Sequence, residues 1–384
     1  MRSDISAKDK RKKIKSATAT FIKKHKLEDN PNVKIGIMSE DASIGNVKQF
    51  KTGNIALDLL TGGFFQGMVN VIYGGQSVGK STMMRDMVKY TQENYDAFGL
   101  YMNQEKTMDR TYWEKAGVDM DKLTVAEFET VEQSLDMCNK CATGEIPVDL
   151  LMIDTLQALS PDSEIHKGKD TKSVEANTIA QIPRLYSQFL RMYTSLNTGL
   201  SMVLVSQVRT AGIGGGGMPF DGMTGGNAIA HYCNLIVKLT KSESFTQWPY
   251  TITALPPHSY VVLMKIDKIK GAGRYRGLKI KGYFYKGKFD RRFNIIAIGK
   301  DLGVHDGKSF SYPDPTNPEE MIEYKVAGIN AMLNGVKPLP DEAVDYMETL
   351  LEPAFLKLAN EEMGDLIEED IALDEIDLSI IEEN

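Results

Sequence analysis

The chain has 384 residues, of which 42% are hydrophobic and 25% are charged, so it can bury a large core and global disorder is excluded. This length predicts about two domains, or one large core with appendages. We find no apolar run near the ~18 residues that span a bilayer, and no apolar segment behind the charged N-terminus, so we expect neither a membrane partner nor a secretory signal. Three cysteines are too few for disulfide bonds to stabilise so long a chain, which favours a reducing, cytoplasmic setting.

The net charge of −7, from 45 Lys and Arg against 52 Asp and Glu, argues against a nucleic-acid partner, but this charge is unevenly distributed. Residues 1–26 carry a local charge of +8, residues 265–292 carry +9, and residues 361–384 carry −11. The chain therefore has a basic arm, a basic stripe and an acidic tail. Each terminal run fits a solvated arm as well as an interaction surface.

Helical and strand-like patterns follow one another along most of the chain. Residues 5–26 contain no Gly or Pro and predict a basic helix, and residues 30–46 predict a linker. Beyond residue 55, apolar strand-like runs alternate with helical patterns. The predicted strands are 69–73, 99–103, 150–153, 202–206, 235–239 and 260–265, and the predicted helices between them are 81–95, 131–143 and 178–196.

This alternation predicts an α/β fold whose mostly parallel central sheet is covered on both faces, with an antiparallel extension where strands crowd together after residue 235. Pro313, Pro315 and Pro318 mark a boundary, after which 319–333 and 341–360 predict helices. We therefore divide the chain into an N-terminal helix and linker for oligomerisation (1–49), the α/β core (50–312), a small helical C-terminal region (313–360) and an acidic tail (361–384).

The most specific motif is GGQSVGKS, from Gly74 to Ser81, which fits the pattern G-x-x-x-x-G-K-[S/T]. It follows the apolar run VNVIY and opens the helical pattern STMMRDMVKY, which is the context that the pattern requires. Glycines let backbone N–H groups curl around phosphate oxygens at the positive end of a helix. Lys80 is expected to reach the outer phosphates and Ser81 to ligate Mg²⁺. The residues predicted to bind ATP here are Gly74, Gly75, Gln76, Ser77, Val78, Gly79, Lys80, Ser81 and Thr82.

Two carboxylates follow other predicted strands. Asp154 ends the apolar run DLLMID, a pattern that holds Mg²⁺ directly or through water, although many buried strands also end in Asp. Glu105 comes just after GLYMN, at the end where a parallel sheet gathers its ligands. A carboxylate there can accept a proton as water attacks the γ-phosphate, and a surface Glu in a connecting loop is the alternative.

Several motifs, in order, resemble the RecA family of homologous-recombination ATPases and in particular its phage-encoded branch. TGNIALDLLTGG before the phosphate loop resembles the entry to that family's core, and VDLLMIDTLQALSP resembles its Mg²⁺ strand. QEKTMDRTYWEKAGVDMDKL resembles the segment with its catalytic Glu, and VSQVR followed by TGGNAIAHYCN resembles its glutamine sensor and the helix after its second DNA loop. The resemblance covers residues 50–312 and implies a RecA-type P-loop ATPase core with ATP and Mg²⁺ as cofactors.

The resemblance also implies roles for individual residues. Glu105 would be the catalytic base, acting with Lys80, and Gln207 would be the sensor that reaches toward the γ-phosphate. Asp109 and Tyr112 would flank the adenine.

One position departs from the family pattern. In bacterial members, a Lys-x-Lys pair on a late strand reaches the γ-phosphate held by the neighbouring subunit. Lys268 matches the second lysine and is the expected catalytic group, but Ile266 stands at the first position. Lys265, Lys270 or no residue replaces that first lysine.

DNA contacts are expected in two loops and the helices that follow them. Gln207 heads a glycine-rich loop, and ligand contacts that order such a loop would couple two sites, whereas a flexible spacer is the alternative. The expected DNA-contacting residues are Lys167, Lys169 and Lys172 in the first loop (161–177), Arg184 and Arg191 on the next helix, Arg209, Ile213, Met218 and Phe220 in the second loop, and Gly225, Gly226 and Asn227 at the helix start behind it. Arg184 and Arg191 also fit surface arginines on an amphipathic helix.

Aromatic side chains interleave with Lys and Arg in the basic stripe. They are Tyr275, Tyr283, Phe284, Tyr285 and Phe289. Cations for phosphates beside aromatics for bases are typical of a nucleic-acid surface, which predicts a secondary duplex-binding site. The alternation in LKIKGYFYKG fits an ordinary half-buried strand pair equally well.

These residues and the resemblance together imply an ATP-dependent DNA strand-exchange recombinase, a DNA-dependent ATPase in a bacterial cell or a phage-infected host. The expected partners are single-stranded DNA, double-stranded DNA at a secondary site, further copies of the chain in a helical filament, and single-strand-binding or loader proteins. The acidic tail could compete with DNA for the basic surfaces. A hexameric helicase on the same core and a non-hydrolysing, DNA-coating filament are the alternatives.

Overall fold

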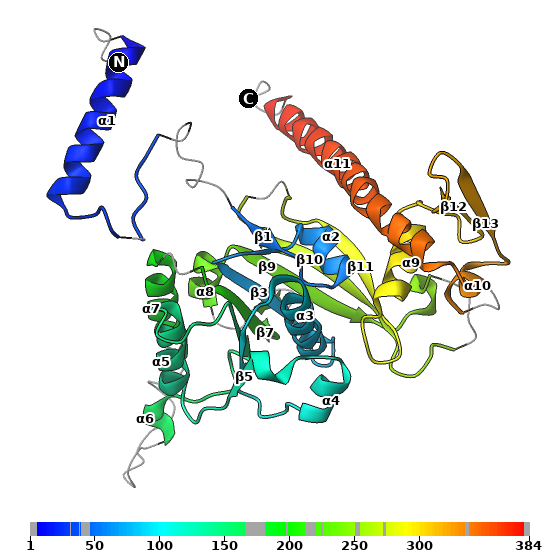
Figure 1. The fold of residues 1–384 in the computed structure, drawn as a ribbon, viewed down its shortest axis with the longest axis horizontal. Helices are drawn as coiled ribbons and strands as arrows, with labels where there is room; N and C mark the ends of the chain where they lie inside the picture. Colours follow the sequence, from blue (N-terminus) through cyan, green and yellow to red (C-terminus); the bar gives the residue numbers. More distant parts are fainter. Residues whose placement is uncertain are drawn as a thin grey trace.

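The computed structural model describes residues 6–30, 32–37, 39, 47–165, 181–196, 199–211, 220–223, 226–249, 254–271, 274–334 and 338–379. A central sheet lies among helices, with the N-terminal helix at one side and the C-terminal elements at another (Figure 1). Every helix in these ranges is too short or too polar to cross a lipid bilayer.

A nine-stranded sheet forms the centre of the structure, in the order β11-β10-β9-β3-β7-β6-β4-β5, with β8 paired to β7. The strands from β9 to β5 in that order run parallel, while β10, β11 and β8 pair antiparallel. This confirms the predicted α/β fold and its antiparallel extension. The strands are β3 (Val69–Gly74), β4 (Gly99–Asn103), β5 (Leu123–Ala126), β6 (Leu150–Asp154), β7 (Ser201–Ala211), β8 (Phe220–Met223), β9 (Leu235–Ser242), β10 (Tyr260–Ile269) and β11 (Lys279–Phe284).

Successive residues of a strand point to opposite faces of the sheet, so each strand presents apolar side chains to both faces. Helices cover both of these faces. On β3, Ile72 belongs to one buried cluster and Val71 to the other. The first cluster includes residues of α2 (Ile55–Thr61), α3 (Lys80–Tyr95), α9 (Arg291–Asp301) and α11 (Asp341–Ser379), and the second includes residues of α5 (Val131–Ala142), α7 (Gln181–Ser195) and α8 (Gly226–Tyr232). The shorter elements are β1 (Gln49–Phe50), β2 (Phe64–Phe65), α4 (Arg110–Lys115) and α6 (Asp162–Ile165), with 3-10 turns at Met120–Lys122 and Phe245–Gln247.

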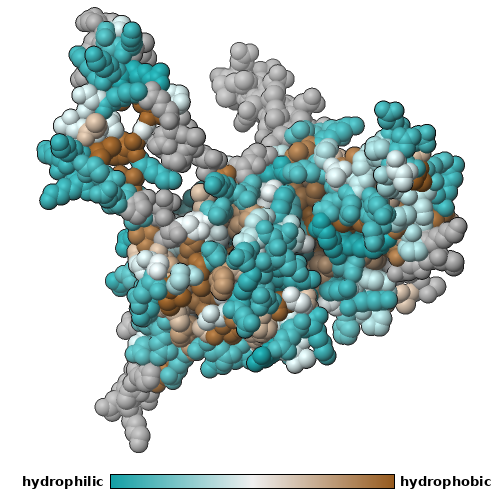
Figure 2. Space-filling model, viewed as in Figure 1, coloured by the Kyte–Doolittle hydropathy of each residue, from teal (hydrophilic) through white to brown (hydrophobic). Residues whose placement is uncertain are grey.

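The basic N-terminal segment forms α1 (Ala7–Lys24), as predicted. Its surface is mostly hydrophilic (Figure 2), and the Ser6 side chain caps its first turn. Ile14 and Phe21 are nevertheless 57% and 50% exposed. Because they are seven residues apart, they lie on one face of the helix, where they are available to pack on another surface.

The predicted helix at 319–333 is partly wrong. Its first part forms β13 (Met321–Lys325), which pairs antiparallel with β12 (Ser309–Pro313). Residues of β13 alternate between exposed and half-buried, the period of two that a surface strand requires. The proline-rich segment makes the turn between these strands, where Asp314 accepts a hydrogen bond from the Thr316 N–H at 2.7 Å.

Two helices follow this hairpin, namely α10 (Ile329–Asn334) and α11. Helix α11 begins where a helix was predicted, but it continues to Ser379, through most of the acidic segment. Met347 and Phe355 of α11 belong to the same buried cluster as Ile296 of α9. The C-terminal helix therefore packs on the core, and the four-part division of the chain stays a prediction.

Candidate active site

Four parallel strands end at one edge of the sheet and bring the predicted site residues together. Gly74 at the end of β3 pairs in register with Gln207 of β7, and Asn103 of β4 pairs with Asp154 at the end of β6. Glu105 follows β4 in a turn. The carboxyl ends of parallel strands are where open α/β sheets bind their ligands.

Glycines shape the loop between β3 and α3. Gly79 has a φ of 93°, in the left-handed region, and is the N-cap of α3. A Cβ on Gly74 would lie 2.5 Å from the carbonyl oxygen of Leu239, so the neighbouring strand leaves no room for a side chain. The loop thus leads into the positive end of a 16-residue helix, where unpaired backbone N–H groups can bind phosphate.

Lys80 is the first residue of α3, and its ammonium group points back into the loop. Its Nζ donates to the carbonyl oxygens of Gly75 at 2.6 Å and Gly74 at 3.1 Å. Burial lowers the pKa of Lys80, while the carboxylates of Asp154 and Glu105 raise it. A phosphate in this loop would add a further anion and favour the charged ammonium.

Asp154 is buried between two hydroxyl groups. Its Oδ2 accepts hydrogen bonds from Ser81 Oγ at 2.7 Å and from Tyr101 OH at 2.8 Å. Burial raises the pKa of Asp154, and these two hydrogen bonds oppose the rise. The described residues contain no group of three or more His, Cys, Asp or Glu that could hold a metal ion. The oxygen atoms of Ser81 and Asp154 are ligands of the kind that Mg²⁺, a hard cation, takes beside phosphate and water.

The carboxylate of Glu105 is tied to two neighbouring strands. Its Oε1 accepts hydrogen bonds from Thr155 Oγ1 at 2.9 Å and from Gln207 Nε2 at 3.1 Å. Both contacts are made across the strand ends, so they orient the carboxylate relative to the phosphate loop. Sequence patterns did not identify Thr155 or Tyr101, because their part in the site depends on which strands are neighbours.

A cavity of about 440 Å³ lies at these strand ends. Its lining residues are Gln76, Ser77, Gly79, Lys80, Ser81, Thr82, Glu105, Asp154, Thr155, Gln207, Tyr260 and Phe284. Tyr260 and Phe284 were not predicted; their rings stack with centroids 4.6 Å apart, and the Tyr260 hydroxyl donates to the carbonyl oxygen of Ser77 at 2.9 Å. The antiparallel extension thus supplies one wall of the cavity.

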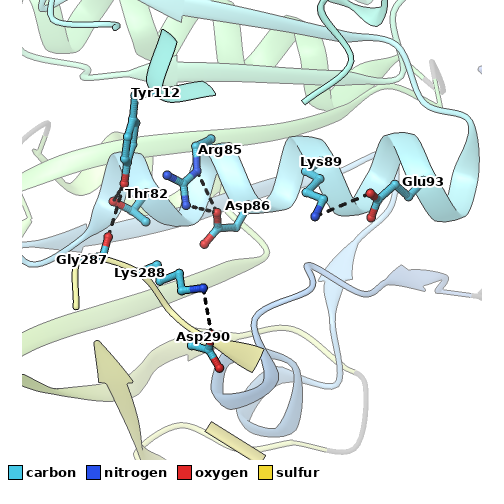
Figure 3. Close-up of polar contacts among 9 residues, drawn as sticks. All are labelled: Thr82, Arg85, Asp86, Lys89, Glu93, Tyr112, Gly287, Lys288 and Asp290. Atoms are coloured by element: carbon cyan, nitrogen blue, oxygen red, sulfur yellow. Dashed lines mark hydrogen bonds and ion pairs between the residues drawn. The ribbon is translucent and has the colours of Figure 1, made fainter. Parts of the chain in front are cut away.

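A second cavity, of about 500 Å³, lies along α3 beside Tyr112 (Figure 3). The Arg85 guanidinium lies 4.2 Å from the centroid of the Tyr112 ring, and the Tyr112 hydroxyl lies 3.4 Å from Thr82 Oγ1. Because Thr82 lines the first cavity, it connects the two. Asp109 lines neither cavity but caps α4, where its Oδ1 accepts a hydrogen bond from the Tyr112 N–H at 3.3 Å. The Tyr112 ring offers a flat wall for a planar base.

Lys268 lies on β10 and lines neither of these cavities. Its Nζ donates to the carbonyl oxygen of His231 at 3.1 Å, and Lys270 Nζ donates to the same oxygen at 3.2 Å. Burial, and then the charge of Lys270, lower the pKa of Lys268. Lys265 instead lies 3.8 Å from the carboxylate of Asp267. Lys268 and Lys270 therefore form a converging cationic pair.

The described part of the predicted DNA surface begins on α7, where Arg184 and Arg191 are both exposed. Strand β7 pairs with β8, so Arg209 and Phe220 lie on a hairpin where an irregular loop was predicted. Helix α8 begins at Gly226. Lys167, Lys169, Lys172, Ile213, Met218 and Gly225 lie outside the described residues, as do the side chains of Arg209, Phe220 and Asn227.

The aromatic residues of the basic stripe contact the core, and three of them, Tyr275, Tyr285 and Phe289, are half-buried. Tyr283 and Phe284 are buried. The ring of Tyr285 stacks on Phe293 with centroids 4.3 Å apart, and Tyr275 donates its hydroxyl to a carbonyl oxygen of α11. These contacts favour the alternative of a half-buried strand pair over rings that stack on bases, and the secondary duplex-binding site stays a prediction.

Strand pairing creates a row of lysines that the sequence alone does not reveal. Lys238 of β9 lies opposite Lys265 of β10, which lies opposite Lys279 of β11. Residues directly opposite in antiparallel strands share a face of the sheet, and like charges in such pairs repel. In this lysine row (Lys238, Lys265 and Lys279), Asp267 lies 3.8 Å from Lys265 and offsets part of the repulsion, and a polyanion bound across the row would offset the rest.

Comparisons with known proteins agree with this geometry. A family model described as the RecA N-terminal domain matches residues 22–287. Protein RecA of Bacteroides thetaiotaomicron is 28% identical over 316 residues, which cover 79% of this chain and 88% of that protein. Protein RecA of Sulfurimonas denitrificans is 30% identical over 281 residues, covering 71% and 76%, and that of Helicobacter acinonychis is 26% identical over 331 residues, covering 80% and 91%. The family match begins within α1 and ends just beyond β11, so it spans the whole central sheet.

Two glycines of the phosphate loop are expected to respond differently to alanine. Gly79→Ala should lower the free energy of unfolding by more than ~1 kcal/mol, because its φ of 93° disfavours a side chain and its Cβ would lie 3.1 Å from Phe289 and 3.2 Å from Phe284. Gly75→Ala is the matched control, since its Cβ would meet nothing within 4 Å. Urea unfolding compares the two, and equal midpoints would contradict the assigned strain.

Proposed function

The chain belongs to the RecA family, and from that premise we propose that it is an ATP-dependent strand-exchange recombinase that polymerises on single-stranded DNA and pairs it with homologous duplex. It is a DNA-dependent ATPase. The hydrogen bond between Gln207 and Glu105 carries the proposal. Gln207 lies on the strand that leads into the glycine-rich segment expected to bind DNA, so this contact would connect that segment to the phosphate cavity.

In the proposed reaction, ATP occupies the phosphate cavity with its base against Tyr112. Lys80 binds the outer phosphates, and Ser81 and Asp154 hold Mg²⁺, which when bound neutralises charge on the phosphate oxygens. Glu105 accepts the proton of the water that attacks the γ-phosphate. Its two hydrogen bonds support this role, because a base must be oriented before it can act.

Other copies of the chain are the next partners that we propose. Lys268 and Lys270, as the converging pair, would reach the γ-phosphate held by the neighbouring subunit. Helix α1 would dock on that neighbour through Ile14 and Phe21, whose exposure supports this role. We also propose single-strand-binding or loader proteins as partners. Because the proposed partner is DNA, we expect a cytoplasmic setting.

DNA would bind at two surfaces. Arg184 and Arg191 would hold the phosphates of the primary single strand, together with the loop residues predicted above. The lysine row would attract the incoming duplex, because its cations are aligned across three strands.

A D-loop assay tests the proposed function directly. With ATP, Mg²⁺, single-stranded DNA and homologous supercoiled duplex, the wild-type protein should form joint molecules. Lys80→Ala should abolish them, because the outer phosphates lose their cation. Lys140→Ala, which removes an exposed lysine paired with Glu145 on another surface, is the control. Closed rings that unwind a forked duplex and form no joint molecules would instead establish the helicase.

Replacing Glu105 tests its assignment as the base. Glu105→Gln keeps the shape and an oxygen acceptor but cannot take up a proton, so DNA-stimulated kcat should fall about 100-fold or more. Binding of a fluorescent ATP analogue should be retained. Glu114→Gln removes an exposed carboxylate paired with Arg110 and should change neither quantity. Unchanged hydrolysis in Glu105→Gln would remove Glu105 from this role.

The lysine row is expected to act in duplex capture. Lys238→Ala combined with Lys279→Ala should weaken duplex binding by a filament already formed on single-stranded DNA, and should reduce the salt dependence of log K by about 2. Lys308→Ala combined with Lys325→Ala makes the same change of charge at the distal hairpin. Equal salt slopes for the two double variants would exclude the row as a duplex site.

A further inference from the structure

Arg85 is a buried cation on the helix that follows the phosphate loop. It lies on α3 and is only 5% exposed, in a stretch whose Met84 and Met87 belong to the apolar core. Burial of a guanidinium is unfavourable unless the group is paired, because its charge loses its hydration. The contacts that offset this cost therefore indicate what Arg85 does.

An ion pair and an aromatic ring make these contacts. The Arg85 Nε donates to Asp86 Oδ1 at 2.9 Å, and its Nη2 donates to the same oxygen. The centre of the guanidinium lies over the Tyr112 ring, 4.2 Å from its centroid, which is a cation–π contact. The ion pair thus holds the guanidinium at α3, and the guanidinium in turn lies against the face of Tyr112.

The Tyr112 side chain is 41% exposed, but α3 contacts it at two places. Its hydroxyl lies 3.4 Å from Thr82 Oγ1 and 3.5 Å from the carbonyl oxygen of Gly287. Thr82 and Arg85 are three residues apart, so they lie on the same face of α3. Thr82 contacts the tip of the ring, whereas Arg85 contacts its face. The contact with Arg85 therefore fixes the plane of a ring that the other contacts hold only at its hydroxyl.

Arg85 covers one face of the ring and leaves the other for a ligand. Figure 3 shows the ring edge-on, with the Arg85 guanidinium on the side toward Lys89. The opposite face looks toward the beginning of α3, where the phosphate loop ends. A planar base whose phosphates lie in that loop would meet this uncovered face of Tyr112.

We propose that Arg85 is a positioning residue for ATP, which holds the Tyr112 ring in the plane on which the base stacks. Arg85 lines the second cavity and not the phosphate cavity, and its charge is paired with Asp86, so it acts on the ring and not on the phosphates. A ring that is already oriented loses less freedom when the base binds, which raises affinity. This role rests on the proposed function, in which the base of ATP lies against Tyr112.

The test is Arg85→Gln, which keeps a flat side chain able to donate to Asp86 and removes the cation. The dissociation constant of a ribose-labelled fluorescent ATP analogue, and KM for ATP, should rise about fivefold. The value of kcat at saturating ATP and DNA should not change, because the groups around the γ-phosphate are intact. Arg85→Met makes the same test if Arg85→Gln does not fold.

Inorganic tripolyphosphate separates an effect on the base from an effect on the phosphates. It carries the phosphate chain of ATP without a base, and it is measured as a competitor of the fluorescent analogue. Its inhibition constant should be the same in the wild type and in Arg85→Gln. An equal rise for tripolyphosphate and ATP would show that Arg85 attracts phosphate and would overturn the proposal. A folded Arg85→Gln with wild-type affinity for ATP would also overturn it.

Lys89→Met is the matched control for charge. Lys89 lies one turn further along α3, lines the same cavity and pairs with Glu93 at 3.7 Å. Its removal takes the same charge from the cavity and should leave the affinity for the analogue unchanged. A loss equal to that of Arg85→Gln would favour a general attraction of anions and overturn the positioning role.

A double variant tests whether Arg85 acts through Tyr112. Tyr112→Leu should itself weaken binding of the analogue, and Arg85→Gln added to it should weaken binding no further, because the ring that Arg85 holds is already gone. Multiplied losses would reject the role of Arg85 and leave the proposed recombinase intact. A wild-type protein that binds tripolyphosphate as tightly as ATP would instead reject the placement of the base against Tyr112, and with it both proposals for this cavity.

Discussion

Parallel hydrogen bonding among the central strands is the constraint on which the rest of the site depends. Pairing of Gly74 with Gln207 and of Asn103 with Asp154 fixes where the chain leaves the sheet. Both faces of these strands are buried, and a slip of one residue would exchange them, so that Asp154 would lose its contacts with Ser81 and Tyr101. The strand pairing therefore brings together side chains that are distant in sequence, and their loops need not contact one another.

Burial then sets the electrostatics of the converged groups. It disfavours both the charged ammonium of Lys80 and the charged carboxylate of Asp154, and their attraction compensates only in part. A polyanion accompanied by a divalent cation would supply Lys80 with an anion and Asp154 with a cation together. The pair is thus matched to a metal-bound phosphate chain better than to either ion alone.

The sequence predicted those structural features that depend on contiguous residues. The phosphate loop, the Asp154 strand and the helix before residue 26 were all recognisable, because their turn residues and periodicity are contiguous. The hairpin of β12 and β13 around Pro315 was not predicted, because prolines occur in a turn as readily as at a domain boundary. The pairing of Lys238 with Lys265 and the burial of Tyr283 and Phe284 depend on sheet order and helix docking, which no short window of the sequence encodes.

Glu105 is the point at which these long-range contacts meet. Its carboxylate accepts a hydrogen bond from Gln207 on β7, and the residue before it, Gln104, donates a hydrogen bond to Ser134 of α5. Strand β7 leads into one expected DNA loop, and α7 follows the other. Under the proposed function, DNA that orders the segment after β7 would act on Glu105 through Gln207, and hydrolysis would then be coupled to DNA binding.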